Sequence, residues 1–170
     1  MGERPVHRRL AARVIVLAAD EVLLMGDTDP GVPGSRFWQA PGGGVEDDES
    51  VRAAAARELK EETGLVLDEE LLEGPVAVRR LLRGYSDRIL VQDETFFRLH
   101  TPRFEPVAAG LTERERSRHV ASRWVNLDAL PENTWPGEMA ALARWEGPDP
   151  VDLGGVEEST VPIADGDLEV

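Results

Sequence analysis

Cysteine is absent from this chain of 170 residues. Its absence excludes disulfides, thiol catalysis, zinc sites built from thiolates and iron–sulfur clusters. Long apolar runs are missing too: the longest, Val14–Ala19, has the length of a strand and falls far short of the ~18 residues of a membrane span. The N-terminus has no extended apolar region of the kind found in secretory signals, so we expect a cytoplasmic protein.

Positive charge is also scarce, and the formal net charge is −14. This balance argues against a broad electrostatic interaction with nucleic acid polymers or anionic membranes, and we expect neither as a partner. The charge is uneven, because residues 146–170 contain eight acidic residues and no Lys or Arg. We therefore predict one domain over residues 1–145 and an acidic, irregular C-terminal tail over 146–170. The apolar patch Val161–Ala164 in this tail is expected to dock on the body or on a partner.

The length of the chain fits a single domain with a substantial core. Apolar runs bounded by turn residues predict six strands: Leu10–Leu17, Val22–Met25, Phe37–Ala40, Pro75–Leu82, Ile89–Leu99 and Ala121–Asn126. Helices are expected at Ser50–Thr63, Asp128–Leu130 and Gly137–Trp145. This mixture favours an α/β sandwich over a helical bundle.

The helix expected at Ser50–Thr63 carries an unfavourable distribution of charge. Glu58, Glu61 and Glu62 fall within about 100° of one another around the helix axis, in its last turns. A like-charge pair four residues apart costs roughly 0.2–0.5 kcal/mol, and each acid near a helix C-terminus costs about 0.3–1 kcal/mol. A bound divalent cation would offset this repulsion, since Mg²⁺ and Mn²⁺ prefer oxygen ligands. On the helix alone, a solvated acidic helix end is an equally good interpretation.

The surrounding sequence favours the cation. Gly43 is followed after five residues by Glu49 and, after seven more, by the segment 57–65, which reads Arg-Glu-Leu-Lys-Glu-Glu-Thr-Gly-Leu. All nine specified positions match the signature of the Nudix hydrolase family, with an expected chance frequency on the order of 10⁻⁶. The chain therefore resembles MutT-like Nudix hydrolases over about residues 8–145.

The resemblance implies a Nudix α/β/α sandwich with a mixed sheet. It places Mg²⁺ or Mn²⁺ on Glu58, Glu61 and Glu62, with a backbone carbonyl near Gly43. It also makes Glu61 or Glu62 the base that takes a proton from water, and Arg57 the residue that orients these carboxylates. The remaining signature residues are expected to be structural.

Their expected roles differ. Glu49 or Glu61 should pair with Arg57 through two hydrogen bonds. Gly43 and Gly64 are expected to allow a tight turn and a helix cap. Leu59 and Leu65 are expected in the core.

Other residues are weaker candidates for the same site. Glu94 is the first candidate for a further metal ligand and Glu115 the second, although either could be an ordinary surface acid. Trp38 could stack on a nucleobase or cap the core. Several arginines could hold substrate phosphate or ribose. Four of them lie within ten positions, at Arg79, Arg80, Arg83 and Arg88, and the fifth, Arg36, lies in the loop before the signature.

The resemblance implies hydrolysis of a nucleoside diphosphate linked to another moiety, by attack of water on phosphorus. The alternative is a non-catalytic nucleotide-binding or regulatory module on the same fold. Such modules usually lose the signature glutamates, which are all present here. The expected partner is a nucleotide or nucleoside-diphosphate derivative, and homodimers are common in the family.

Overall fold

The computed structural model describes residues 3–168. In chain order its elements are β1 (Val6–Ala18), β2 (Glu21–Asp27), β3 (Phe37–Gln39), β4 (Gly42–Gly44), α1 (Val51–Thr63), η1 (Glu69–Leu71), β5 (Glu73–Gly84), β6 (Ile89–His100), α2 (Glu113–Arg118), β7 (His119–Asn126), β8 (Thr134–Trp135), α3 (Met139–Ala143) and β9 (Val151–Glu157). Within residues 3–168, no helix is both long and apolar enough to cross a membrane.

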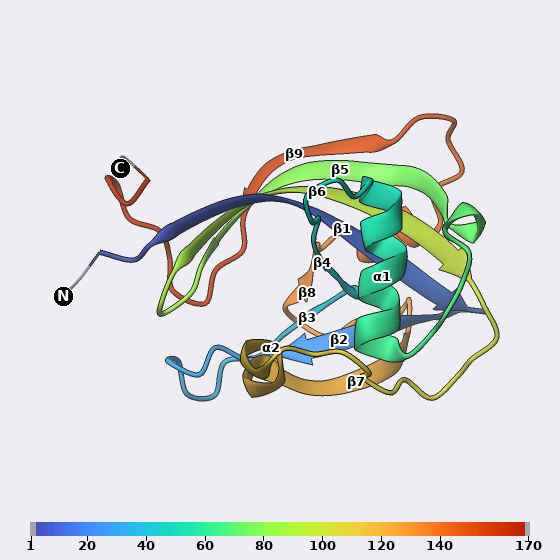
Figure 1. The fold of residues 1–170 in the computed structure, drawn as a ribbon, viewed down its shortest axis with the longest axis horizontal. Helices are drawn as coiled ribbons and strands as arrows, with labels where there is room; N and C mark the ends of the chain where they lie inside the picture. The colour runs from blue at the N-terminus through green and yellow to red at the C-terminus, as the bar shows by residue number, and fades with distance from the viewer. Residues whose placement is uncertain (1–2, 169–170) are drawn as a thin grey trace.

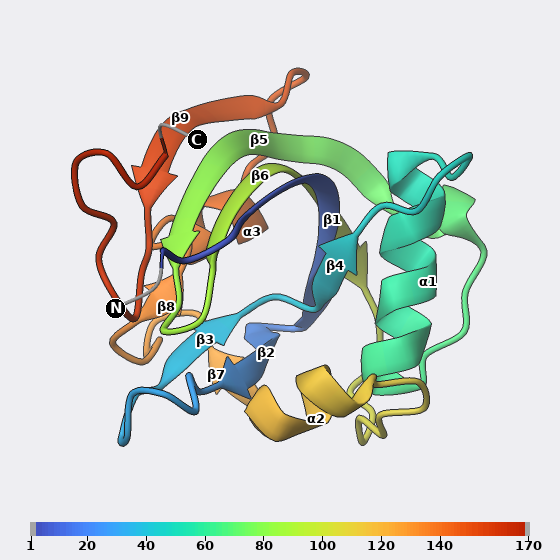
Figure 2. The same cartoon turned by 60° about the vertical axis from the view of Figure 1, so that its left-hand side comes forward.

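The strands form one curled, mixed sheet (Figures 1 and 2). Its order is β8-β3-β2-β1-β6-β5-β9, with β4 paired to β1 and β7 paired to β2. The long strands β1 and β6 are parallel over twelve residue pairs. In contrast, β1 pairs with β2 only at the hairpin end, which leaves its Ala11–Arg13 segment free to pair with β4. This divergence of β1 from β2 opens the sheet beside the glycine-rich strand β4.

The two faces of β1 bury different helices. Val14 and Val16 belong to a core cluster with Ala54, Ala55 and Leu59 of α1. On the alternate face, Ile15 and Leu17 pack in a cluster that includes Met139 and Leu142 of α3. Because successive side chains of a strand point to opposite faces, the helices cover the two sides of the sheet. The predicted α/β/α arrangement with a mixed sheet is therefore confirmed.

Helix α1 has the predicted boundaries. The Ser50 hydroxyl accepts a hydrogen bond from Ala53 N at the N-terminus. At the other end, Gly64 has φ +79°, and its N–H donates to the carbonyl of Lys60. A glycine tolerates this left-handed conformation without the steric penalty of a Cβ. These caps fix where the acidic last turns of α1 lie.

The predicted strands all exist, with ends that differ by a few residues, but the shorter elements differ more. Residues 127–129 form a turn followed by a bend, so the helix predicted at 128–130 is wrong, and the helix predicted at 137–145 contracts to α3. Helix α2 and strands β4 and β8 were not predicted. Helix α2 is short, and none of its residues is buried, so it has no apolar periodicity to reveal it.

The C-terminal tail is not irregular throughout, and that prediction is wrong for residues 151–157. These residues form β9, which pairs in parallel with β5 at the edge of the sheet (Figure 2). Just beyond β9, the buried Glu158 carboxylate bonds to Arg79 at 2.8 Å and to Arg83 at 3.1 Å. Further on, the carbonyl of Val161 accepts a hydrogen bond from Arg4. The tail thus docks on the body through strand pairing and buried ion pairs.

Candidate active site

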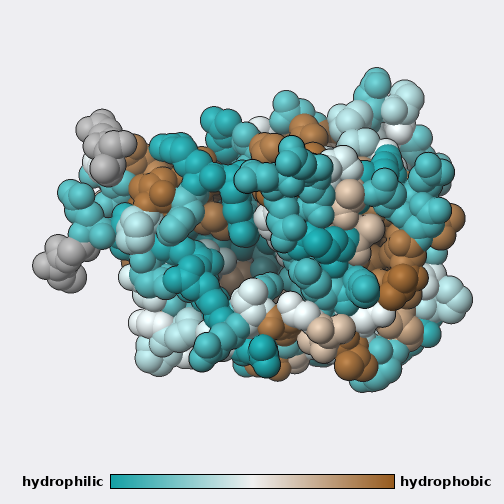
Figure 3. Space-filling view, in the orientation of Figure 1, coloured by the Kyte–Doolittle hydropathy of each residue, from teal (hydrophilic) through white to brown (hydrophobic). Residues whose placement is uncertain are grey.

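A cavity of about 620 Å³ opens between α1, α2, β4 and the turn that joins β5 to β6. Figure 3 shows the surface hollowed beside α1, with mostly hydrophilic residues around the hollow. The glycines of β4 line its floor together with Glu58 and Glu62. The opening of the sheet beside β4 therefore exposes the acidic end of α1 to the cavity.

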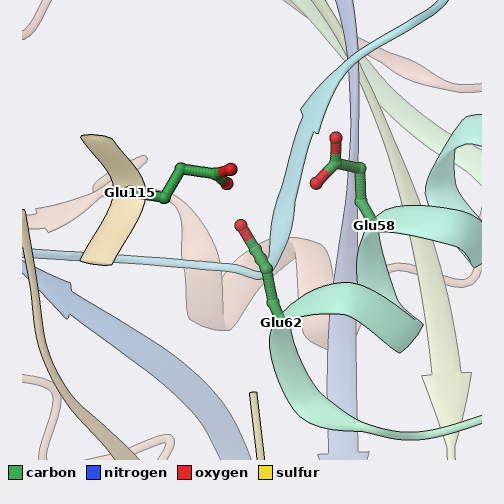
Figure 4. A group of neighbouring side chains, drawn as sticks. All are labelled: Glu58, Glu62 and Glu115. Carbon is green, nitrogen blue, oxygen red and sulfur yellow. The ribbon is translucent and has the colours of Figure 1, made fainter. Parts of the chain in front are cut away.

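Three carboxylates meet in this cavity. Glu58 and Glu62 project from α1, and Glu115 reaches them from α2, so that one oxygen of each lies within 4.8 Å of the others (Figure 4). Helix α2 is held beside the end of α1 because Ala109 and Gly110 donate backbone hydrogen bonds to the carbonyl of Glu61. Glu115, the second candidate for a further ligand, is thus the residue that completes the cluster.

The cluster is electrostatically unfavourable when fully ionised. Two unit charges at this separation repel by about 3 kcal/mol at an effective dielectric constant near 20. Burial raises the pKa of Glu62 well above its usual range, although Arg13 and a hydrogen bond from Gly42 N at 2.8 Å oppose the rise. Burial also raises the pKa of Glu58 despite the neighbouring Arg57.

Arg57 organises the other glutamates of the signature. Its Nε and Nη2 atoms donate to the two oxygens of Glu49 at 2.8 and 3.0 Å, which is the predicted two-bond pair. Its Nη1 donates to both Glu58 and Glu61 at 3.1 Å. Arg57 thus links Glu61 to Glu58, and Glu61 is not a member of the three-carboxylate cluster. The pKa of Arg57 rises strongly, chiefly because of the bond to Glu49.

Gly43 leaves the space that Glu58 occupies. A Cβ atom at Gly43 would lie 2.6 Å from the Glu58 Oε1 atom, closer than atoms can approach without displacement. The cluster consists only of carboxylate oxygens, which are the donors that Mg²⁺ and Mn²⁺ prefer. The residues present therefore fit a hard divalent cation.

Glu94 does not join this cluster. Its side chain is buried, and its oxygens accept hydrogen bonds from Arg13 and Arg79 at 2.7 Å and from Gln92 at 2.6 Å. Burial alone would raise the pKa of Glu94, but Arg13, Arg79 and Arg83 outweigh it and lower the pKa to about 2. With its oxygens engaged in this way, Glu94 is neither the expected metal ligand nor a surface acid.

The arginines expected to bind substrate lie elsewhere in the fold. Arg79 and Arg83 are buried in ion pairs with Glu94 and Glu158 and do not line the cavity, although Arg83 donates to the lining residue Gln39 at 2.9 Å. The Arg36 guanidinium lies 6.0 Å from the ring of Trp38 and is also outside the cavity wall. The structure therefore does not bring these three arginines to the cavity wall.

Trp38 belongs to the core. It is 5% exposed, and it packs in the cluster on the α3 side of the sheet. A Cβ at Gly26 would lie 2.7 Å from its ring, so the glycine accommodates the indole. Of the two interpretations of Trp38, the structure favours the cap on the core.

Sequence reasoning missed most of the basic residues that do line the cavity. They come from three separate elements: Arg8, Arg9 and Arg13 from β1, Arg88 from the β5–β6 turn, and Arg114 and Arg118 from α2. Only Arg88 belonged to the arginine group noted in the sequence. No local signal could have gathered the others, because they are up to about a hundred residues apart in the chain and meet only through the sheet topology.

Comparison with known proteins was made at the level of families and of individual chains. The family model described as NUDIX domain matches residues 7–145. Nudix hydrolase 25 of Arabidopsis thaliana is 54% identical over 44 residues, a match that spans 26% of this chain and 24% of that protein. The matched segment thus covers about a quarter of the curated relative.

Solved structures match over most of the chain. The MutT NUDIX hydrolase of Burkholderia pseudomallei is 25% identical with a TM-score of 0.60, covering 80% of this chain and 96% of that one. An ADP-ribose pyrophosphatase of Streptococcus suis is also 25% identical, with a TM-score of 0.54, covering 85% and 98%.

Proposed function

The chain belongs to the Nudix hydrolase family, and we propose that it hydrolyses a nucleoside diphosphate linked to another moiety, in a reaction that depends on a divalent cation. The observation that carries this proposal is the convergence of Glu58, Glu62 and Glu115 in a cavity large enough for a nucleotide. The names of its structural relatives, a MutT NUDIX hydrolase and an ADP-ribose pyrophosphatase, support the same substrate class. We further propose that it acts in the cytoplasm.

The three clustered carboxylates, with a backbone carbonyl near Gly43, would hold Mg²⁺ or Mn²⁺. Glu61, which shares Arg57 with Glu58, is proposed as an additional ligand. When bound, such an ion supplies charge neutralisation to the phosphate oxygens and lowers the pKa of water. Gly42 N fixes Glu62 Oε2. Arg57 holds Glu58 and Glu61 in place through hydrogen bonds from its Nη1.

Glu62 is the better candidate for the base. A general base must lie within reach of the water that it deprotonates, and Glu62 lines the cavity whereas Glu61 does not. Glu61 instead accepts a hydrogen bond from Arg57 Nη1 at 3.1 Å and lies outside the three-carboxylate cluster. We therefore assign to the Glu62 carboxylate the proton of the attacking water, and to Arg57 the positioning of its neighbours.

The proposal is tested with a panel of ADP-ribose, dinucleoside polyphosphates and nucleoside triphosphates, with Mg²⁺ or Mn²⁺. We expect turnover that chelation abolishes, and ¹⁸O from labelled water in one phosphate product. Glu62→Gln should lower kcat at least about a hundredfold. The matched control Glu132→Gln replaces an exposed acid outside the cavity and should retain full activity.

Two results would overturn the proposal. Unchanged turnover in Glu62→Gln would refute the assignment of the site. Absence of turnover across the panel, with nucleotide binding retained, would instead support a non-catalytic binding module.

A further inference from the structure

The cavity has a second charged region at its far end. The β5–β6 turn lies well apart from α1 (Figures 1 and 2). Tyr85 and Arg88 of this turn line the same cavity as Glu58 and Glu62 of α1. Arg118 approaches the same ring from α2, so that its guanidinium carbon lies 4.7 Å from the Tyr85 centroid and that of Arg88 lies 4.8 Å away. Two cationic side chains therefore converge on one aromatic residue.

The two cations differ in their compensation. Arg118 donates to both oxygens of Asp87 at 3.1 Å, and Arg114 lies 3.7 Å from the same carboxylate. Within residues 3–168, Arg88 has no ion pair and no hydrogen-bond partner for its side chain. The pKa of Arg88 is lowered by burial and by the charges of Arg118 and Arg114.

The free donors of Arg88 are open to solvent in the cavity. No buried side-chain nitrogen or oxygen in the described part of the chain lacks a hydrogen-bond partner. The unpaired N–H groups of Arg88 must therefore contact water. Stacking on Tyr85 uses the face of the guanidinium and leaves the donors in its plane available.

The concentration of positive charge is unusual for this protein. Six of its 19 Lys and Arg residues line this one cavity, although the chain as a whole carries a net charge of −14. Arg9 continues the basic lining toward the carboxylates, since its Nη1 lies 3.1 Å from the position of a Cβ on Gly44. The cavity thus changes from acidic beside α1 to basic beside the β5–β6 turn.

We propose that Arg88, together with Arg118, binds a second phosphate group of the substrate, beyond the diphosphate that is cleaved. This inference rests on the proposed function and narrows its substrate class. Planar guanidinium groups bind phosphate oxygens through two donors at once, and the crowded cations would be relieved by an anion. That phosphate can belong to a longer polyphosphate chain or to a separate phosphomonoester.

The test uses two pairs of compounds that differ mainly in phosphate. The first pair is ADP-ribose and its 2′-phosphate, and the second is diadenosine diphosphate and diadenosine tetraphosphate. We expect the phosphate-rich member of at least one pair to bind about tenfold or more tightly, as one charge-assisted contact provides. The pair that shows the effect identifies the source of the phosphate.

Variants connect this preference to the arginine. Arg88→Gln should remove the difference within the responding pair and leave the phosphate-poor member unaffected. Arg88→Lys should restore part of it, because the charge remains but the planar donors do not. Arg116→Gln on α2 is the matched control, since Arg116 is exposed and outside the cavity wall. Thermal unfolding verifies that each variant is folded.

Affinity is measured by calorimetry in the Glu62→Gln background as well as by kcat/KM in the otherwise unchanged protein. If the protein hydrolyses none of these compounds, the proposed function is refuted. The affinities then still test whether Arg88 binds the second phosphate. Equal affinity within both pairs, absence of binding, or equal effects of Arg88→Gln on both members would overturn the inference.

Discussion

Glu94→Gln should destabilise the protein strongly, although the substitution barely changes the shape of the side chain. The carboxylate is 1% exposed and lies between Arg13 and Arg79, at 2.7 Å from each. Neutralising it removes the counter-ion of the buried Arg13, while Arg79 keeps only its pair with Glu158. Breaking a buried ion pair in this way costs about 3–5 kcal/mol.

The pKa gives a second measure of the same free energy. A carboxyl whose pKa falls from 4.5 to about 2 on folding contributes about 3 kcal/mol at neutral pH. Because the folded-state pKa of Glu94 is depressed, this contribution is complete above pH ~4.5 and is lost as the pH falls toward 2. The stability difference between the two proteins should therefore fall to less than half by about pH 3.

Asp93→Asn is the matched control, since Asp93 directly precedes Glu94 in β6 and pairs with Arg80 on the surface. The side chains of Asp93 and Arg80 are 49% and 62% exposed, and exposed pairs contribute little. Urea unfolding at pH 7, 5 and 3 measures all three proteins. Equal losses in the two variants, or a difference for Glu94→Gln that does not change with pH, would refute the reasoning.

Three further outcomes are expected. Glu158→Gln should lower the free energy of unfolding by about 3 kcal/mol in urea titrations, because it removes the counter-ion of the buried Arg83, while Arg79 keeps its pair with Glu94. An unchanged value would contradict an integral role for the C-terminal strand. In metal-free buffer at pH 7, Glu62→Gln should raise Tm, because burial raises the pKa of Glu62 and its ionised form therefore destabilises the fold. The gain in Tm should vanish near pH 4.5, where the acid is protonated in the folded protein. A lower Tm for Glu62→Gln at pH 7, measured by calorimetry, would contradict this reasoning. Gly43→Ala should lower kcat/KM about tenfold or more, because the added Cβ displaces Glu58. The control Gly137→Ala should leave kcat/KM unchanged, because a Cβ at Gly137 would meet open space. Equal kcat/KM values for the two variants would refute the role given to Gly43.

Local signals predicted the centre of the fold and the acidic face. Helix α1 begins after the cap residue Ser50 and ends at the cap residue Gly64. The four-residue spacing of Glu58 and Glu62 places both side chains on one side of this helix. These features depend on residues a few positions apart, where helix geometry is fixed by the backbone. Sequence reasoning is therefore dependable for the helix that carries the signature.

Contacts between distant residues could not be predicted in the same way. Arg79 and Arg83 were considered as substrate contacts, yet their partner Glu158 lies more than seventy residues further along the chain. The acidic composition around Glu158 indicates an irregular tail, because nothing local shows that two buried arginines require its charge. Glu115 was only the second candidate for the same reason, since the placement of α2 against α1 is a tertiary contact.

The most direct test of the central claim is a titration with Mn²⁺, in which electron paramagnetic resonance measures the free ion. The protein should bind Mn²⁺ at the carboxylate cluster, and Glu62→Gln should weaken that binding at least about tenfold while Glu132→Gln leaves it unchanged. Equal binding by the protein and Glu62→Gln, or no binding by the protein at all, would contradict the account.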